Sequence, residues 1–207
     1  MNDPQIVFFL VTSLLVILIP GQDMVLVMSR GMTQGASAGI VTAAGVSVGL
    51  LGHTILAALG LGALLLSSEL LFTVLKYIGA IYLAYLGIKL IFTQATELEL
   101  ESANRKPLKR LFTEGALSNI ANPKVTIFYF AFLPQFISTD IKDPAIYLIV
   151  LGVSFSVLTF LVKAPIGFFA GVASTWIRTR PIVLQAINKI SGTVLIGLGA
   201  KLALGQR

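Results

Sequence analysis

The chain has 207 residues, of which 56% are hydrophobic and only 12% are charged, and its mean hydropathy is +0.92. A soluble domain carries roughly 25% charged residues, so this composition excludes a water-soluble globular protein and indicates one integral membrane domain. The net charge of +6 comes from short segments between apolar runs, which is typical of membrane orientation signals. We therefore expect a lipid bilayer as partner and no nucleic acid.

The sequence contains no cysteine and one histidine, His53. Disulfides, iron–sulfur clusters and cysteine zinc sites are thereby excluded. A lone histidine is also too little for a dedicated metal site or a haem with two axial ligands. We expect no cofactor, no metal and no enzymatic activity, and a membrane redox protein is disfavoured.

Six apolar stretches are long enough to cross a bilayer, since a spanning helix needs about 20 predominantly apolar residues. They form two groups of three, separated by the hydrophilic passage from Gln94 to Arg110. We predict an all-α integral membrane protein with a first three-helix repeat over 1–93, a cytoplasmic loop over 94–110 and a second three-helix repeat over 111–207. The stretches cover roughly 6–29, 38–66, 70–93, 112–137, 144–172 and 182–205.

Lys and Arg in the short loops predict the orientation of the chain. The odd-numbered loops carry Arg30, the basic run from Arg105 to Arg110, and Arg178 with Arg180. The opposite side has little beyond Lys142 and the terminal Arg207. We therefore expect the odd-numbered loops in the cytoplasm and both termini on the other side.

A repeated motif closes each half of the chain. Its two parts at 76–79 and 86–90 return at 189–192 and 198–202, with a one-residue slip between the parts. Because each half has three spans, the second copy is inserted upside down relative to the first. The predicted fold is two inverted repeats, and transporters of this design carry their site where the repeats meet.

The first span is interrupted by Pro20, Gly21, Gln22 and Asp23. Proline removes a backbone donor and glycine relaxes the chain, so the break leaves backbone groups unpaired at membrane depth. Such backbone is tolerated only where protein or a water-filled cavity covers it. A kink that merely shapes packing explains Pro20 and Gly21 equally well. A carboxylate inside a span costs several kcal/mol, however, so Asp23 indicates a functional site.

The fourth span breaks at the corresponding place, around Pro123. Two interrupted segments in matching positions are the best sequence pointer to a transport site. Asn119, Asn122 and Thr126 fall at i, i+3 and i+7 and share one face of an ideal helix, whereas Lys124 does not. We predict a substrate site formed by Pro20, Gly21, Gln22, Asp23, Asn119, Asn122, Pro123 and Lys124.

Lys163 is a second ionisable residue inside a predicted span. Counted at 1.5 Å per residue from the cytoplasmic ends, Asp23 lies about 9 Å deep, Lys163 about 13 Å and Lys124 about 18 Å. By depth, Lys163 is the better ion-pair partner for Asp23. A long lysine can instead snorkel towards the cytoplasmic face. The sequence leaves both alternatives open.

His53 shares a helical face with Gly45 and Gly49, a small-residue stripe that packs helices together. We expect His53 to point into the bundle, where it serves either as a packed, hydrogen-bonded histidine or as a proton relay. The same stripe permits packing within the monomer or against a second copy, so a homo-oligomer stays possible.

With these segments identified, the chain resembles the lysine-exporter (LysE) superfamily and is most similar to its homoserine/threonine-resistance (RhtB) branch. Three signatures carry the resemblance over almost the whole chain, and Leu133-Pro134-Gln135-Phe136 also matches. They are 20–23 against Pro-Gly-Pro-Asp, 119–124 against Asn-x-x-Asn-Pro-Lys, and 76–87 against Lys-x-x-Gly…Tyr-Leu-x-Tyr-Leu-Gly. Gln22 replaces the second proline of the first signature, and Lys163 belongs to none of them.

The resemblance implies a six-helix carrier of the bacterial inner membrane that exports amino acids. The substrates would be neutral, such as homoserine, threonine or leucine, or basic, and the driving force would be the proton gradient. The alternative is an inorganic-ion or metal exporter, a role found in distant parts of the superfamily. That role requires clusters of metal-binding side chains within the spans. Asp23 and His53 alone do not form such a cluster, so this alternative is disfavoured.

Overall fold

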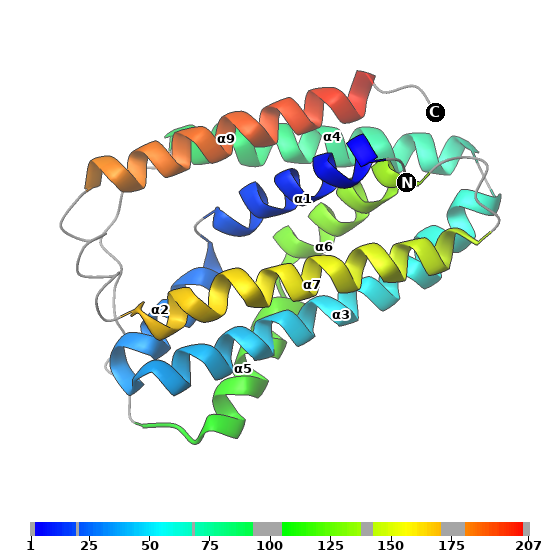
Figure 1. The fold of residues 1–207 in the computed structure, drawn as a ribbon. Helices are drawn as coiled ribbons and strands as arrows, with labels where there is room; N and C mark the ends of the chain where they lie inside the picture. Colours follow the sequence, from blue (N-terminus) through cyan, green and yellow to red (C-terminus); the bar gives the residue numbers. More distant parts are fainter. Residues whose placement is uncertain are drawn as a thin grey trace.

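The computed structural model describes residues 3–19, 21–67, 69–92, 105–137, 143–170 and 181–204. Every regular element in these ranges is a helix (Figure 1), so the all-α class is confirmed. Pro20, one of the predicted site residues, lies outside them. The helices are α1 (Asp3–Leu18), α2 (Gln22–Gln34), α3 (Ala36–Ser67), α4 (Glu69–Phe92), α5 (Leu108–Ile120), α6 (Pro123–Phe132), the short 3₁₀ helix η1 (Leu133–Phe136), α7 (Pro144–Phe168) and α9 (Pro181–Leu204).

Two of the described helices are individually long and apolar enough to cross a membrane: the segment Ala36–Gly60 of α3, and α7. A third span results if Ile6–Leu18 and Gln22–Gln34 are counted as one bent pair. Large apolar side chains also cover outward faces, for example Leu59, Ile81 and Phe92, each at least 70% exposed. These features are those of a helical membrane protein, because a water-soluble surface rarely carries so much apolar area.

The first predicted break separates α1 from α2, whose axes differ in direction by 59°. Near this break, the Ile19 amide bonds to the Val16 carbonyl at 3.2 Å in a tighter, 3₁₀-type turn. Gly21 then caps α2 in an extended conformation, without a side-chain hydrogen bond to the helix. The backbone thus ends one helix and starts another where the sequence predicts an interruption.

The second predicted break separates α5 from α6, and Pro123 is its physical cause. Proline is favoured at the first position of a helix because its missing N–H has no partner to lose there. In a continuous helix, residue 123 would donate to the Asn119 carbonyl, and proline cannot. The Asn122 amide bonds to that carbonyl at 3.0 Å instead, which closes α5. α5 itself begins at Leu108, inside the segment predicted to be loop.

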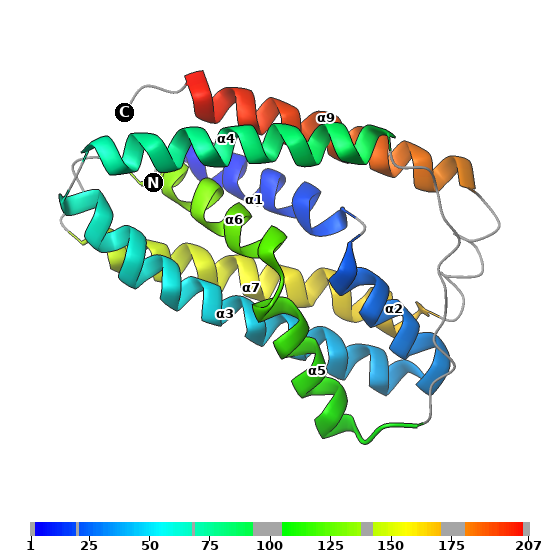
Figure 2. The same cartoon turned by 180° about the vertical axis from the view of Figure 1, so that it is seen from behind.

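Two pairs of helices form the sides of the molecule, and α1 and α6 run between them (Figures 1 and 2). In the first pair, α3 lies along α7, and their backbones approach closely at Gly39 and Gly167. In the second pair, α4 lies along α9. There an added Cβ on Gly87 would lie 2.5 Å from the Gly192 carbonyl oxygen, and an added Cβ on Gly192 would lie 2.5 Å from the Gly87 oxygen.

The repeated motif therefore lies in the interface between α4 and α9. The second glycine of its first copy, Gly87, contacts the first glycine of its second copy, Gly192. An added Cβ on Gly199, the second glycine of the second copy, would lie 2.7 Å from the Ala80 carbonyl oxygen, next to Gly79. Small residues at these positions let the two backbones approach closely enough to pack directly.

Candidate functional site

The two breaks border one cavity of about 650 Å³, a volume that includes open solvent at its mouth. The first break contributes Gly21, Gln22 and Asp23 to the wall, and the second contributes Asn122. α7 adds Thr159 and Lys163. The rest of the wall is mainly apolar: Val16, Ile17, Ile19, Met24, Leu50, Leu86, Val125, Phe128, Phe155 and Leu195.

Asp23 and Lys163 form a buried ion pair on this wall. The Lys163 Nζ donates to the Asp23 Oδ2 at 3.4 Å, and the two side chains are 9% and 8% exposed. The sequence left open whether Lys163 pairs with Asp23 or snorkels towards the cytoplasmic face. In the structure it pairs with Asp23. Paired charges offset part of the cost of burying each one.

A second donor holds the same carboxylate. The Asn119 Nδ2 donates to the Asp23 Oδ2 at 2.7 Å, so two donors share one oxygen. The other oxygen, Oδ1, is buried and has no hydrogen-bond partner among the described residues. Asp23 also lies in the first turn of α2, where the helix dipole favours a negative charge. The carboxylate is therefore oriented by Asn119 and Lys163, and one of its oxygens accepts no hydrogen bond among the described residues.

His53 contacts Asn119 and is 1% exposed, which confirms that it points into the bundle. Its Nε2 lies 3.0 Å from the Asn119 carbonyl oxygen, the acceptor that Pro123 leaves without its helical donor. Its Nδ1 lies 3.4 Å from the Thr126 hydroxyl. The histidine thus joins the two sides of the second break.

Most of the predicted site residues therefore lie at or near the cavity, but they have different structural roles. Gly21, Gln22, Asp23, Asn122 and Lys163 line the cavity. Asn119 orients Asp23, and Pro123 starts α6. Lys124 lies in the first turn of α6, and its side chain is outside the described part of the structure.

The prediction that Asn119, Asn122 and Thr126 share one helical face is wrong. The helix ends at Ile120 and a new one starts at Pro123, so the ideal i, i+3, i+7 spacing does not apply across the break. Instead, the Asn119 side chain reaches Asp23, Asn122 reaches the cavity and Thr126 reaches His53.

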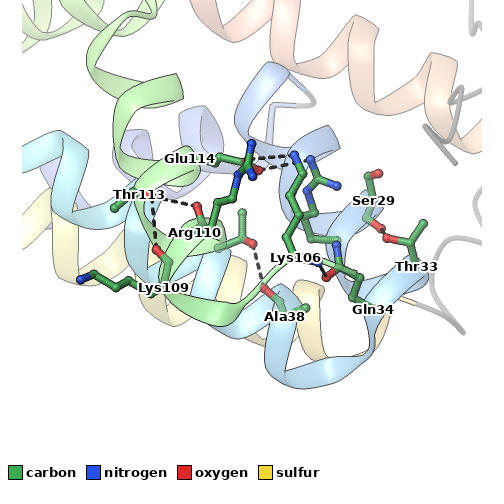
Figure 3. A network of polar contacts seen from close by, with 11 residues as sticks. Ser29, Thr33, Gln34, Ala38, Lys106, Lys109, Arg110, Thr113 and Glu114 are labelled. Atoms are coloured by element: carbon green, nitrogen blue, oxygen red, sulfur yellow. Dashed lines mark hydrogen bonds and ion pairs between the residues drawn. The ribbon is translucent and has the colours of Figure 1, made fainter. Parts of the chain in front are cut away.

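Sequence reasoning missed a polar network that joins α2 to α5 (Figure 3). Glu114 accepts from three cations: Arg30 Nη2 at 3.3 Å, Lys106 Nζ at 2.7 Å and Arg110 Nε at 3.3 Å. Gln34 also accepts from the Lys106 amide at 2.8 Å. A signal was present, because Glu114 is a carboxylate within the predicted span 112–137 and such residues need partners.

The two breaks are also joined directly. The Gln22 Nε2 donates to the Ser118 hydroxyl at 3.2 Å. Gln22 is the residue that replaces a proline in the motif of the first break. Its side chain therefore provides a contact to α5 that a proline at this position does not make. In the part of the chain that the structure describes, no group of three or more His, Cys, Asp or Glu side chains is placed to hold a metal ion.

Comparison with known proteins identifies the family. The family model described as LysE type translocator matches residues 14–206, nearly the whole chain. The chain belongs to this family. The resemblance to the LysE superfamily, drawn from the three sequence signatures, is confirmed, and the protein is a membrane transport protein. No solved structure matches it.

Three relatives of this LysE-type translocator show how far the similarity extends. The chain is 30% identical over 199 residues to the leucine efflux protein of Klebsiella pneumoniae, covering 96% of this chain and 94% of that one. It is 33% identical over 201 residues to the membrane protein YrhP of Bacillus subtilis, with 92% and 94% covered. It is 31% identical over 198 residues to a membrane protein of Vibrio cholerae, with 96% of each covered.

Proposed function

We propose that this translocator is a secondary carrier that exports neutral amino acids with apolar side chains across the bacterial inner membrane. The observation that carries the proposal is the Asp23–Lys163 pair in the wall of an otherwise mainly apolar cavity between the two helix breaks. Such a cavity offers an amino acid both charged contacts and an apolar compartment.

The charged groups of the substrate match the polar part of the cavity. The α-ammonium would bind Asp23, whose Oδ1 has no partner among the described residues. The carboxylate would lie near the start of α6, where the helix dipole favours a negative charge, with Lys163 on the same cavity wall. Asn122 lines the cavity there, and Lys124 follows in the first turn of α6.

The apolar wall favours a neutral substrate over a basic one. Leu86, Phe128, Phe155 and Leu195 offer contacts to an aliphatic side chain but no counter-charge. Among the described wall residues, Asp23 is the acidic one, and the substrate ammonium would occupy it. A basic side chain would then be desolvated without a partner, which is costly. The name of the Klebsiella relative, a leucine efflux protein, points to the same class.

Two inverted repeats over 1–93 and 111–207, with six spans, would provide the alternating access. The reciprocal contacts Gly87–Gly192 and Gly39–Gly167 support this arrangement, because each joins corresponding helices of the two halves. The site between the breaks would then be exposed to either side as one repeat rocks against the other.

The transport cycle that we propose is an antiport with protons. Asp23 would release the substrate ammonium on the outward-open side and take up a proton in its place. The odd-numbered loops would lie in the cytoplasm, with both termini in the periplasm. The cavity lies within one chain, so a homo-oligomer is compatible with this cycle but is not needed for it.

The proposal is tested by efflux from cells preloaded with labelled leucine, methionine, threonine or lysine, with and without the protein. We expect expression to speed the loss of leucine and methionine most and to leave lysine unchanged, since lysine adds an uncompensated charge. A collapsed proton gradient should slow the loss. Accelerated efflux of lysine alone, or no acceleration for any of the four, would refute the assignment.

A further inference from the structure

We propose that Lys163 determines the specificity of the cavity for zwitterions. In the carrier that holds neither substrate nor a proton on Asp23, Lys163 pairs with Asp23, and in the loaded carrier it binds the substrate carboxylate. The inference rests on the proposed function, because it concerns how the same cavity distinguishes an amino acid from an amine or a carboxylic acid.

The contact between Lys163 and Asp23 has the geometry of an exchangeable pair. Charge-assisted N–H···O bonds are usually about 2.7–2.9 Å long. The Lys163 Nζ lies 3.4 Å from Asp23 Oδ2, an oxygen that Asn119 already binds at 2.7 Å. Asn119 therefore holds the carboxylate closely, and Lys163 holds it more loosely. A competing cation can displace the lysine without disturbing the asparagine.

The free oxygen of Asp23 indicates what that competing cation is. Oδ1 is buried and accepts no hydrogen bond in the described structure, and a buried acceptor left unpaired costs free energy. A substrate ammonium has three N–H donors, and Asp23 lines the cavity from which it would approach this oxygen. Its arrival would bring two cations to one carboxylate.

Lys163 would then need another anion, and an amino acid supplies one. The substrate carboxylate is attached to the carbon that carries the ammonium, so it enters the cavity at the same end. Lys163 lines the same wall as Asp23 and is only 7% exposed, so a displaced ammonium has little water to solvate it. An amine without a carboxylate would leave that charge uncompensated.

The Asp23–Lys163 pair therefore disfavours the binding of amines that lack a carboxylate. A lost charge-assisted hydrogen bond corresponds to about 10- to 100-fold in affinity. We expect leucine to bind the unmodified protein at least about tenfold more tightly than 3-methylbutylamine or leucinamide, which keep the ammonium and lack the carboxylate charge.

The test is competition against labelled leucine by leucine, leucinamide, 3-methylbutylamine and 4-methylpentanoate, using the whole purified protein. We expect Lys163→Met to bring leucine and 3-methylbutylamine to within about threefold of each other. Lys163→Arg, which keeps the charge, should keep the preference for leucine. Lys189→Met removes an exposed lysine of α9 as a control and should match the unmodified protein.

Two outcomes separate this inference from the proposed function. If Lys163→Met binds leucine and rejects 3-methylbutylamine as strongly as the unmodified protein does, Lys163 does not read the carboxylate and the inference fails alone. If the unmodified protein binds no leucine, the proposed function fails with it. Should Lys163→Met not fold, Lys163→Gln removes the charge while keeping a donor, and the same comparison applies.

Discussion

Asn119 and Asp23 are 96 positions apart in the chain, yet the Asn119 amide donates a 2.7 Å hydrogen bond to the Asp23 carboxylate. The two residues belong to the two different helix breaks. The bond therefore joins the breaks through buried side chains and fixes the carboxylate on which the proposed transport chemistry depends.

Replacing Asn119 by leucine should weaken both the fold and the site. The substitution keeps the size of the side chain but leaves a buried carboxylate without its closest donor, at a cost of about 1–3 kcal/mol. We expect a lower midpoint of thermal unfolding in detergent and weaker leucine binding. Asn188→Leu changes another buried asparagine, in α9, and should leave leucine binding intact. Equal losses of binding in both variants would argue against a specific role for Asn119.

His53 should prove structural rather than proton-conducting, and His53→Gln distinguishes the two roles. Glutamine can still donate to the Asn119 carbonyl, whose helical donor is missing because residue 123 is proline. It does not titrate. We expect efflux by His53→Gln to keep more than about half of the normal rate, with an unchanged pH profile. His53→Leu should be less stable, because the Asn119 carbonyl loses its bond to His53 and keeps the Asn122 amide as its remaining donor. A flattened pH profile in His53→Gln would establish the histidine as a relay.

Part of this arrangement was predictable from the sequence, because its causes are local. Proline lacks an N–H wherever it occurs, so the break at Pro123 follows from the residue alone. The cost of an unpaired carboxylate in a span likewise predicts partners for Asp23, which the structure provides, whereas its role in transport stays a prediction. The depth argument also places Lys163 near Asp23, as the structure does. Whether Lys163 pairs with Asp23 or snorkels depends on how α7 is rotated about its own axis. That rotation is set by the packing of α7 against the other helices, and the spacing of residues in the sequence does not specify it.

Other parts of the site were beyond the reach of sequence reasoning. Leu86 and Leu195 line the cavity from α4 and α9, but nearly every residue of such a span is apolar. Hydrophobic periodicity then carries little information about which face meets a cavity. The link from His53 to Asn119 is likewise a contact across 66 positions, and nothing in either segment specifies the other.

Gly87 should tolerate no larger side chain. An added Cβ would lie 2.5 Å from the Gly192 carbonyl oxygen, so α4 and α9 would have to separate. We expect Gly87→Ala to destabilise the protein by about 1–3 kcal/mol, measured by thermal unfolding in detergent. Gly197→Ala is the matched control, because nothing lies within 4 Å of its added Cβ. Identical unfolding midpoints for the two variants would show that this glycine contact is dispensable.

The Glu114 network should contribute modestly and in a salt-dependent way. Glu114 is 27% exposed, and its partners range from the buried Arg30 to the largely exposed Arg110. Exposed ion pairs contribute about 0.2–1 kcal/mol each and are screened by salt. We expect Glu114→Gln to lower the unfolding midpoint slightly at low salt, with a smaller difference in high salt. Asp143→Asn removes an exposed carboxylate elsewhere as control. A deficit that is independent of salt would show that packing, rather than charge, is lost.

The central claim is that the cavity at Asp23 binds the amino acid that the carrier exports. The most direct test compares efflux of labelled leucine from preloaded cells expressing the unmodified protein, Asp23→Asn or Asp143→Asn at matched membrane levels. We predict fast loss of leucine with the unmodified protein and with Asp143→Asn, and no loss above background with Asp23→Asn. Normal efflux by Asp23→Asn would contradict the claim.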